Sequence, residues 1–113
     1  MRDRLNEIKR LISNYYYREY DEVLNNETMY DNIEDLGLAY TTTEDWEEDD
    51  IHEVQVSTNI LNMSLQTYID GELLEIYKFR DYKDYKMFLE SLDFDEMIGN
   101  AHDVFNGWKE MCA

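Results

Sequence analysis

The fold of this chain follows from residues 61–79, which read LNMSLQTYIDGELLEIYKF. Apolar and polar residues alternate from Leu61 to Ile69, and a second run of strand-forming residues continues from Glu72 to Phe79. The Asp70-Gly71 pair between them favours a two-residue type I′ turn, because glycine accepts the positive φ that this turn needs. We therefore predict a hairpin that leaves Tyr68 on one face and turns these residues to the core: Leu61, Met63, Leu65, Thr67 and Ile69.

Two further strands are expected upstream of this hairpin. Residues 38–43 are rich in β-forming side chains, and residues 51–57 resume that character. The acidic run at 44–50 has no apolar periodicity and is expected to be a solvated loop or a wide hairpin connection. With a turn at Thr58-Asn59, the strands would form an antiparallel meander of three or four strands.

Helical spacing appears on both sides of the strands. Residues 3–24 carry a stripe of apolar side chains at three- and four-residue spacing, which predicts a long helix. Thr28 is expected to cap a short helix that ends at Gly37. Asp81 and Asp93 precede two further helical patterns, the last of them ending near Gly107. The sequence thus predicts an α+β fold in a single domain, residues 1–113: a long N-terminal helix, a short helix, the meander and two C-terminal helices.

Acidic residues are concentrated in the middle of the chain. Residues 19–77 contain no lysine or arginine and carry 17 of the 27 acidic residues, a charge equal to the whole net charge of −17. Self-repulsion among so many carboxylates opposes folding, and a cationic partner would relieve it. Proline is absent, and the hydrophobic content of 43% is too high for a disordered acidic tail.

The residue types needed for catalysis are sparse. His52, His102 and the single cysteine, Cys112, are far apart in the sequence, and no glycine stands in a G-x-G context. The acidic run lacks the spacing of an EF-hand loop. We therefore predict no catalytic, cofactor or metal site. No apolar run is long enough for a membrane span or a secretory signal, and one cysteine makes no internal disulfide, so a cytoplasmic location is expected.

A charged surface remains as the candidate for function. Alternate side chains of a strand point the same way about 6.7 Å apart, so carboxylates on paired strands repeat like the phosphates of a nucleic acid. Such a surface would compete with nucleic acid for a basic channel, while direct binding to DNA or RNA is disfavoured. The predicted partner-binding residues are Glu44, Asp45, Trp46, Glu47, Glu48, Asp49, Asp50, Glu53, Tyr68, Asp70, Glu72 and Glu75.

The chain resembles small, acidic, proline-poor proteins encoded by phages and conjugative elements of low-GC Gram-positive bacteria. The resemblance is carried by the acidic run at 44–50, the hairpin around Asp70-Gly71 and the tail at 91–98, SLDFDEMI. This class includes anti-CRISPR proteins that inhibit type II RNA-guided nucleases. The resemblance implies a non-enzymatic inhibitor in the bacterial cytoplasm that binds the basic nucleic-acid channel of the effector nuclease and blocks guide RNA loading or target DNA binding.

Other functions fit the same sequence. An immunity protein or antitoxin that neutralises another nuclease would use the same charge. An acidic protein–protein interaction module would bind through its helices and tyrosines, with the charge serving solubility. A small enzyme is the least favoured class, for want of a nucleophile or a ligand set.

Overall fold

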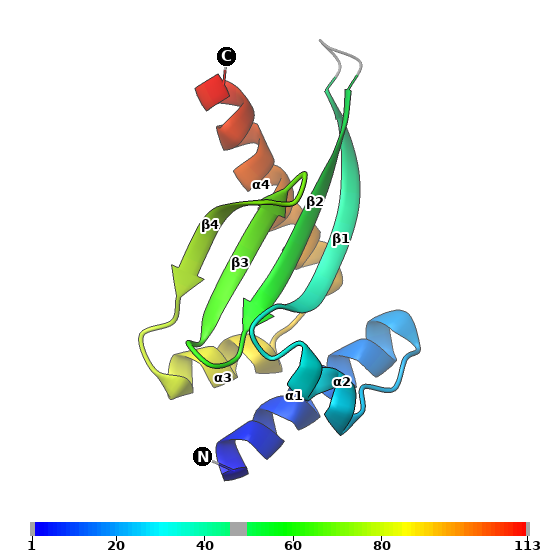
Figure 1. Cartoon of the computed structure of the whole chain (residues 1–113), viewed down its shortest axis with the longest axis vertical. Helices are drawn as coiled ribbons and strands as arrows, with labels where there is room; N and C mark the ends of the chain where they lie inside the picture. The colour runs from blue at the N-terminus through cyan, green and yellow to red at the C-terminus, as the bar shows by residue number, and fades with distance from the viewer. Residues whose placement is uncertain (1, 46–49, 113) are drawn as a thin grey trace.

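Four antiparallel strands form one sheet in the order β1-β2-β3-β4, as a meander (Figure 1). The computed structural model describes residues 2–45 and 50–112. Two helices precede the sheet and two follow it, which confirms the predicted α+β arrangement. The elements are α1 (Arg2–Tyr20), α2 (Asn26–Asp31), β1 (Leu36–Asp45), β2 (Asp50–Asn59), β3 (Ser64–Ile69), β4 (Glu72–Lys78), α3 (Tyr82–Glu90) and α4 (Phe94–Cys112).

The β3–β4 hairpin has the predicted two-residue turn. Ile69 pairs with Glu72, and the two residues between them have positive φ, 53° at Asp70 and 82° at Gly71. Positive φ at both positions defines a type I′ turn, whose twist matches that of the flanking strands. The pairing register of β3 and β4 is therefore set by local chemistry at the turn.

Strand β3 starts later than predicted. Asn59 ends β2 and its side chain accepts hydrogen bonds from the backbone N–H groups of Leu61 and Asn62, which makes a turn where a strand was expected. Leu61 is 63% exposed, so its predicted place in the core is wrong. Leu65 is partly buried, and Thr67 and Ile69 are buried, on the face that was predicted for them.

Strands β1 and β2 are both longer than predicted. Gly37 lies within β1 at an irregularity in the register, and does not end a helix. Glu44, Asp45 and Asp50, expected in a loop, belong to the paired strands. Residues 46–49, the rest of the predicted loop, lie outside the described residues.

Helix boundaries depend on the capping side chains. Asn25, and not Thr28, caps α2, because its side chain accepts from Thr28 N at 2.8 Å. Asp81 and Asp93, which were predicted to precede helices, cap α3 and α4, each accepting a backbone N–H three residues later at 2.9 and 3.0 Å. Helix α4 continues through Gly107, contrary to the predicted end there.

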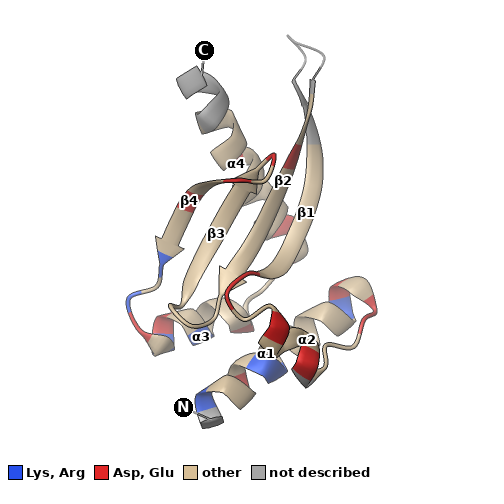
Figure 2. Ribbon diagram, viewed as in Figure 1, with Lys and Arg blue, Asp and Glu red and all other residues tan. Residues whose placement is uncertain are grey.

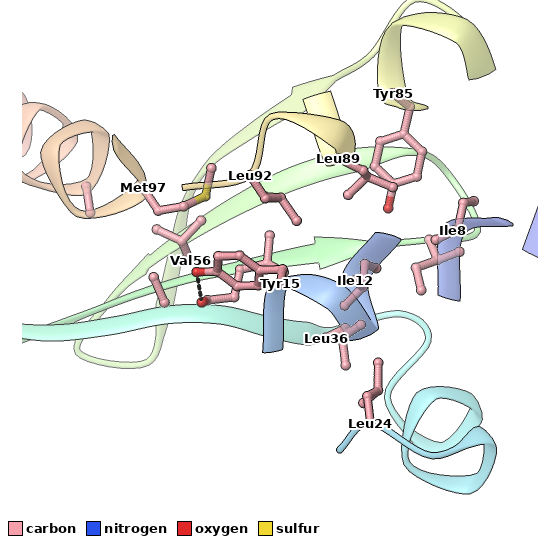
Figure 3. Close-up of a cluster of buried hydrophobic side chains, with 14 of the residues drawn as sticks. Ile8, Ile12, Tyr15, Leu24, Leu36, Val56, Tyr85, Leu89, Leu92 and Met97 are labelled. Carbon is pink, nitrogen blue, oxygen red and sulfur yellow. Dashed lines mark hydrogen bonds between the residues drawn. The ribbon is translucent and has the colours of Figure 1, made fainter. Parts of the chain in front are cut away.

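The core lies between the sheet and the helices. Helix α4 crosses one face of the sheet, against β1, β2 and β3, and α1 packs on α3 beside it (Figure 1). Figure 3 shows the side chains that meet there, including Ile12, Leu89, Val56 and Met97. All four are at most 3% exposed. The opposite face of the sheet, called the open face below, carries Tyr40, Glu53, Gln55, Ser57, Gln66, Tyr68, Leu73 and Ile76, which the strand pairing places on one side.

Tyrosines attach α1 to the first strand. Tyr15 is buried, and its hydroxyl donates to the Leu38 carbonyl at 2.7 Å, where Tyr20 also donates at 2.6 Å. The Tyr16 hydroxyl donates to the Gly37 carbonyl. Tyr17, on the other side of the helix, is 66% exposed, as expected for adjacent residues about 100° apart.

Candidate partner-binding surface

Acidic residues lie at both ends of the molecule, whereas the lysine and arginine residues coloured in Figure 2 lie at one end, mixed with acidic residues. In Figure 2 the lysine and arginine residues lie on α1, at the end of β4, and on α3 with the loop before it. The described ends of β1 and β2, at Asp45 and Asp50, and the β3–β4 turn lie away from these residues, and the described residues around them include no lysine or arginine. We call this region the hairpin end and define it by residues 44–45, 50–53 and 70–72.

Asp70 joins the two hairpins at this end. Its Oδ1 accepts from the backbone N–H of Glu53 at 2.9 Å, and its Oδ2 accepts from His52 Nδ1 at 2.6 Å. The Asp70 N–H in turn donates to the Glu53 carbonyl at 2.8 Å. The hydrogen bond from His52, followed by that from the Glu53 backbone, lowers the pKa of Asp70. The β3–β4 turn is thus held against β2 by a carboxylate that is charged at neutral pH.

Two of the predicted site residues lie on the open face. Glu53 hydrogen bonds with Tyr40, and this bond raises the pKa of the Tyr40 hydroxyl. Tyr68 lies in the middle of the face, where partial burial raises the pKa of its hydroxyl. Beside it, Ser57 is 0% and Gln66 7% exposed, and the Ser57 hydroxyl lies 3.1 Å from the Gln66 side-chain oxygen. Tyr68 therefore lies beside buried polar side chains that hydrogen bond to each other.

The remaining predicted residues do not share that face. Glu75 pairs with Thr67 and lines a groove on the helix side of the sheet. Glu72 begins β4 beside the turn, and Glu44, Asp45 and Asp50 lie in the paired ends of β1 and β2. Trp46, Glu47, Glu48 and Asp49 lie outside the described residues. The structure therefore gathers Glu53, Asp70 and Glu72 at the hairpin end and separates Glu75 from them.

Two carboxylates that were not predicted as site residues lie at the open face and in the groove. Asp35, in the segment before β1, hydrogen bonds with Ser57 at the edge of the open face. Asp103, on α4, lines the same groove as Glu75. Neither position carries a local sequence signal, because strand pairing and helix packing bring these residues into place.

Within residues 2–45 and 50–112, no three His, Cys, Asp or Glu side chains are grouped so that they could hold a metal ion. No helix in that part of the chain is long and apolar enough to cross a membrane. The arrangement offers charge, hydrogen-bonding groups and aromatic surface to a partner. No protein-family model, curated protein or solved structure matches the chain.

Proposed function

We propose that this protein is a non-enzymatic inhibitor that binds the basic nucleic-acid channel of another protein. The observation that carries the proposal is that carboxylates gather at the hairpin end without any lysine or arginine. The lysines and arginines coloured in Figure 2 lie on α1, at the end of β4, and on α3 with the loop before it, while the hairpin end carries carboxylates and no lysine or arginine. A channel lined by lysine and arginine would be attracted more strongly to the hairpin end than to the opposite end, where basic residues lie among the carboxylates, so the charge would favour one orientation.

The shape of the hairpin end suits a channel. The β1–β2 hairpin extends beyond the β3–β4 turn, since Glu53 of β2 already contacts Asp70 of that turn while β2 begins three residues earlier. On this two-stranded projection Asp45 pairs with Asp50 across the strands, Glu44 precedes Asp45, and Glu53 lies three residues after Asp50, so several carboxylates are close together. A channel that neutralises phosphates can pair with them in the same way.

The target proposed is a host defence nuclease, in the most specific form a type II RNA-guided nuclease. The resemblance to phage and conjugative-element inhibitors supports this choice, and the carboxylates of the hairpin end, which has no lysine or arginine, support a basic channel as the site. Inhibition would be by occupancy, with one protein blocking guide RNA loading or target DNA binding. An order-of-addition cleavage assay separates these steps: a block of guide loading requires the inhibitor to be added before the guide RNA.

The test compares two variants that remove the same charge from different ends. The hairpin-end variant neutralises four carboxylates by Glu44→Gln, Asp50→Asn, Glu53→Gln and Glu72→Gln. The control variant neutralises four at and around α2 by Glu22→Gln, Glu27→Gln, Asp31→Asn and Glu34→Gln. Asp70 is left intact in both, because its contacts with His52 and Glu53 also hold the turn.

Affinity for the guide-free nuclease is measured over a range of salt concentrations. We expect the hairpin-end variant to bind more weakly and with a shallower salt dependence, and the control to stay close to the parent protein. Equal weakening of both variants would mean that net charge alone matters and would remove the hairpin end from the proposal. If the nuclease is not bound even at low salt, the proposed target is wrong.

A further inference from the structure

A groove lies on the helix side of the sheet, beside the last strand. Helix α4 packs on β1, β2 and β3, and the space between α4 and β4 forms a groove of about 750 Å³. Its apolar lining comes from Leu65, Leu74, Tyr77, Phe79, Phe88 and Val104. Tyr77 is 58% exposed, so aromatic surface is left open to a partner at the rim.

Helix α4 forms one wall of the groove with a single stripe of residues. Asn100, Asp103, Val104 and Gly107 line the groove at three- and four-residue spacing, which places them on one face of the helix. Gly107 contributes no side chain, and a Cβ atom built on it meets nothing within 4 Å. The groove follows the helix for about two turns, or about 10 Å, which matches three residues of extended chain.

The charges of the lining define the chemistry of the ligand. Glu75 lies on the strand wall and Asp103 on the helix wall, and the described residues that line the groove include no lysine or arginine. Apolar surface between two carboxylates fits an apolar segment that is flanked by basic residues. A second copy of this chain, with its net charge of −17, would bring mainly carboxylates to the same place.

We propose that the groove binds an apolar segment of about three residues, flanked by lysine or arginine, from the polypeptide partner. This rests on the proposed function, since a basic nucleic-acid-binding protein would supply such a segment. Charge at the hairpin end orients the partner, while the groove buries apolar side chains and holds it.

Two glycines of α4 provide matched variants. Gly107→Leu fills the groove without changing charge, and Gly99→Leu places the same side chain on the same helix away from the groove lining. Both positions are exposed and have no atom within 4 Å of the added Cβ. Both substitutions are expected to raise the melting temperature, because leucine favours a helix more than glycine does.

The probe is the peptide acetyl-Lys-Leu-Phe-Leu-Arg-amide, titrated into the full-length ¹⁵N-labelled protein and followed by amide chemical shifts. Its controls are a charge-reversed peptide with Glu at both ends and a basic peptide with Gly-Ser-Gly in the middle. We expect shifts at Leu65, Leu74, Val104 and Gly107 with the first peptide alone. Gly107→Leu should weaken its binding at least about tenfold, because a filled groove no longer buries an apolar side chain, and Gly99→Leu should change it less than about twofold.

A second variant keeps the test independent of any distortion at Gly107. Asp103→Asn leaves the groove open. It should lower the affinity for the basic peptide and raise the affinity for the charge-reversed peptide. Equal binding of the Gly-Ser-Gly peptide, shifts that map to other residues, or unchanged affinity in Gly107→Leu would each overturn the groove proposal.

The two proposals fail in different ways. If the protein binds the guide-free nuclease and the hairpin-end variant binds it more weakly, but Gly107→Leu binds both nuclease and peptide normally, the groove proposal alone is wrong. If the peptide binds the groove as described and the nuclease is not bound even at low salt, the proposed function is wrong and the groove remains a site for a basic, apolar segment.

Discussion

A hydrogen-bonded pair in the core offers a direct test of how α3 is joined to the sheet. Thr58 of β2 and Tyr85 of α3 are both 0% exposed, and their oxygens lie 2.8 Å apart. The Thr58 hydroxyl has one proton and directs it to the Ser64 carbonyl at 2.7 Å, so Tyr85 must be the donor to Thr58. The two substitutions Thr58→Val and Tyr85→Phe therefore remove different numbers of hydrogen bonds.

The expected loss of unfolding free energy in each variant depends on which buried hydroxyl groups are left without a hydrogen-bond partner. Tyr85→Phe removes one donor and leaves Thr58 bonded to Ser64, at a cost of about 1 kcal/mol. Thr58→Val removes the bond to Ser64 and leaves the buried Tyr85 hydroxyl without a partner, so about 2–4 kcal/mol is expected. The double variant has no buried orphan hydroxyl and should cost about 1–2 kcal/mol, less than the sum of the single changes.

The assay is urea unfolding at pH 7 followed by far-ultraviolet circular dichroism, with one slope fitted to all four proteins. The expected coupling between the two side chains is about 2–3 kcal/mol, a sizeable share of a typical domain stability of about 5–15 kcal/mol. Additive costs, or a Thr58→Val variant as stable as Tyr85→Phe, would show that the hydroxyl of Tyr85 is not held by Thr58.

Two further predictions concern pH. Burial raises the pKa of Tyr16 and of Tyr85 to about 12, against about 10 in an unfolded chain. Both tyrosines should therefore contribute stability below pH 10 that is lost as the pH rises toward 12. The midpoint of urea unfolding should fall between pH 8 and 12, and it should fall less steeply in Tyr85→Phe. Asp70 has a lowered pKa, so its contribution to stability is present above the unfolded pKa near 4 and is lost as the pH falls. Asp70→Ala should lower the free energy of unfolding by about 1 kcal/mol at pH 7, after allowance for solvent exposure. The difference in stability between this variant and the parent protein should narrow at pH 3. A gap that is the same at both pH values would mean that the Asp70 charge contributes nothing.

Local chemistry made the β3–β4 turn and the starts of α3 and α4 predictable. The Asp70-Gly71 turn, the helix start after Asp81 and the helix start after Asp93 each depend on residues within a few positions of one another, and all three are confirmed. The prediction at Leu61 is wrong for a related reason. Its alternating pattern continued that of β3, but the Asn59 side chain binds the following backbone N–H groups and turns the chain first.

Helix ends and the candidate site depend on contacts that the sequence does not display. Gly107 does not end α4, because a single glycine costs a helix only about 1 kcal/mol and the chain has no proline to stop it. The excess of carboxylates in residues 19–77 is visible in the sequence, but strand register decides which of them share a face. It places Glu53 on the open face and Glu75 in the groove, where Asp103 arrives from a different element.

The meander order has a consequence for how the protein folds. Each strand pairs with its neighbour in the chain, and the β3–β4 hairpin closes through only two residues, whereas α1 reaches α3 across most of the sequence. Closing a long loop costs more entropy than closing a short one, so we expect the sheet to nucleate first and α1 to dock late. Shortening the side chain of Val56, in the sheet, should then slow folding, while the same change at Ile12, in α1, should mainly speed unfolding.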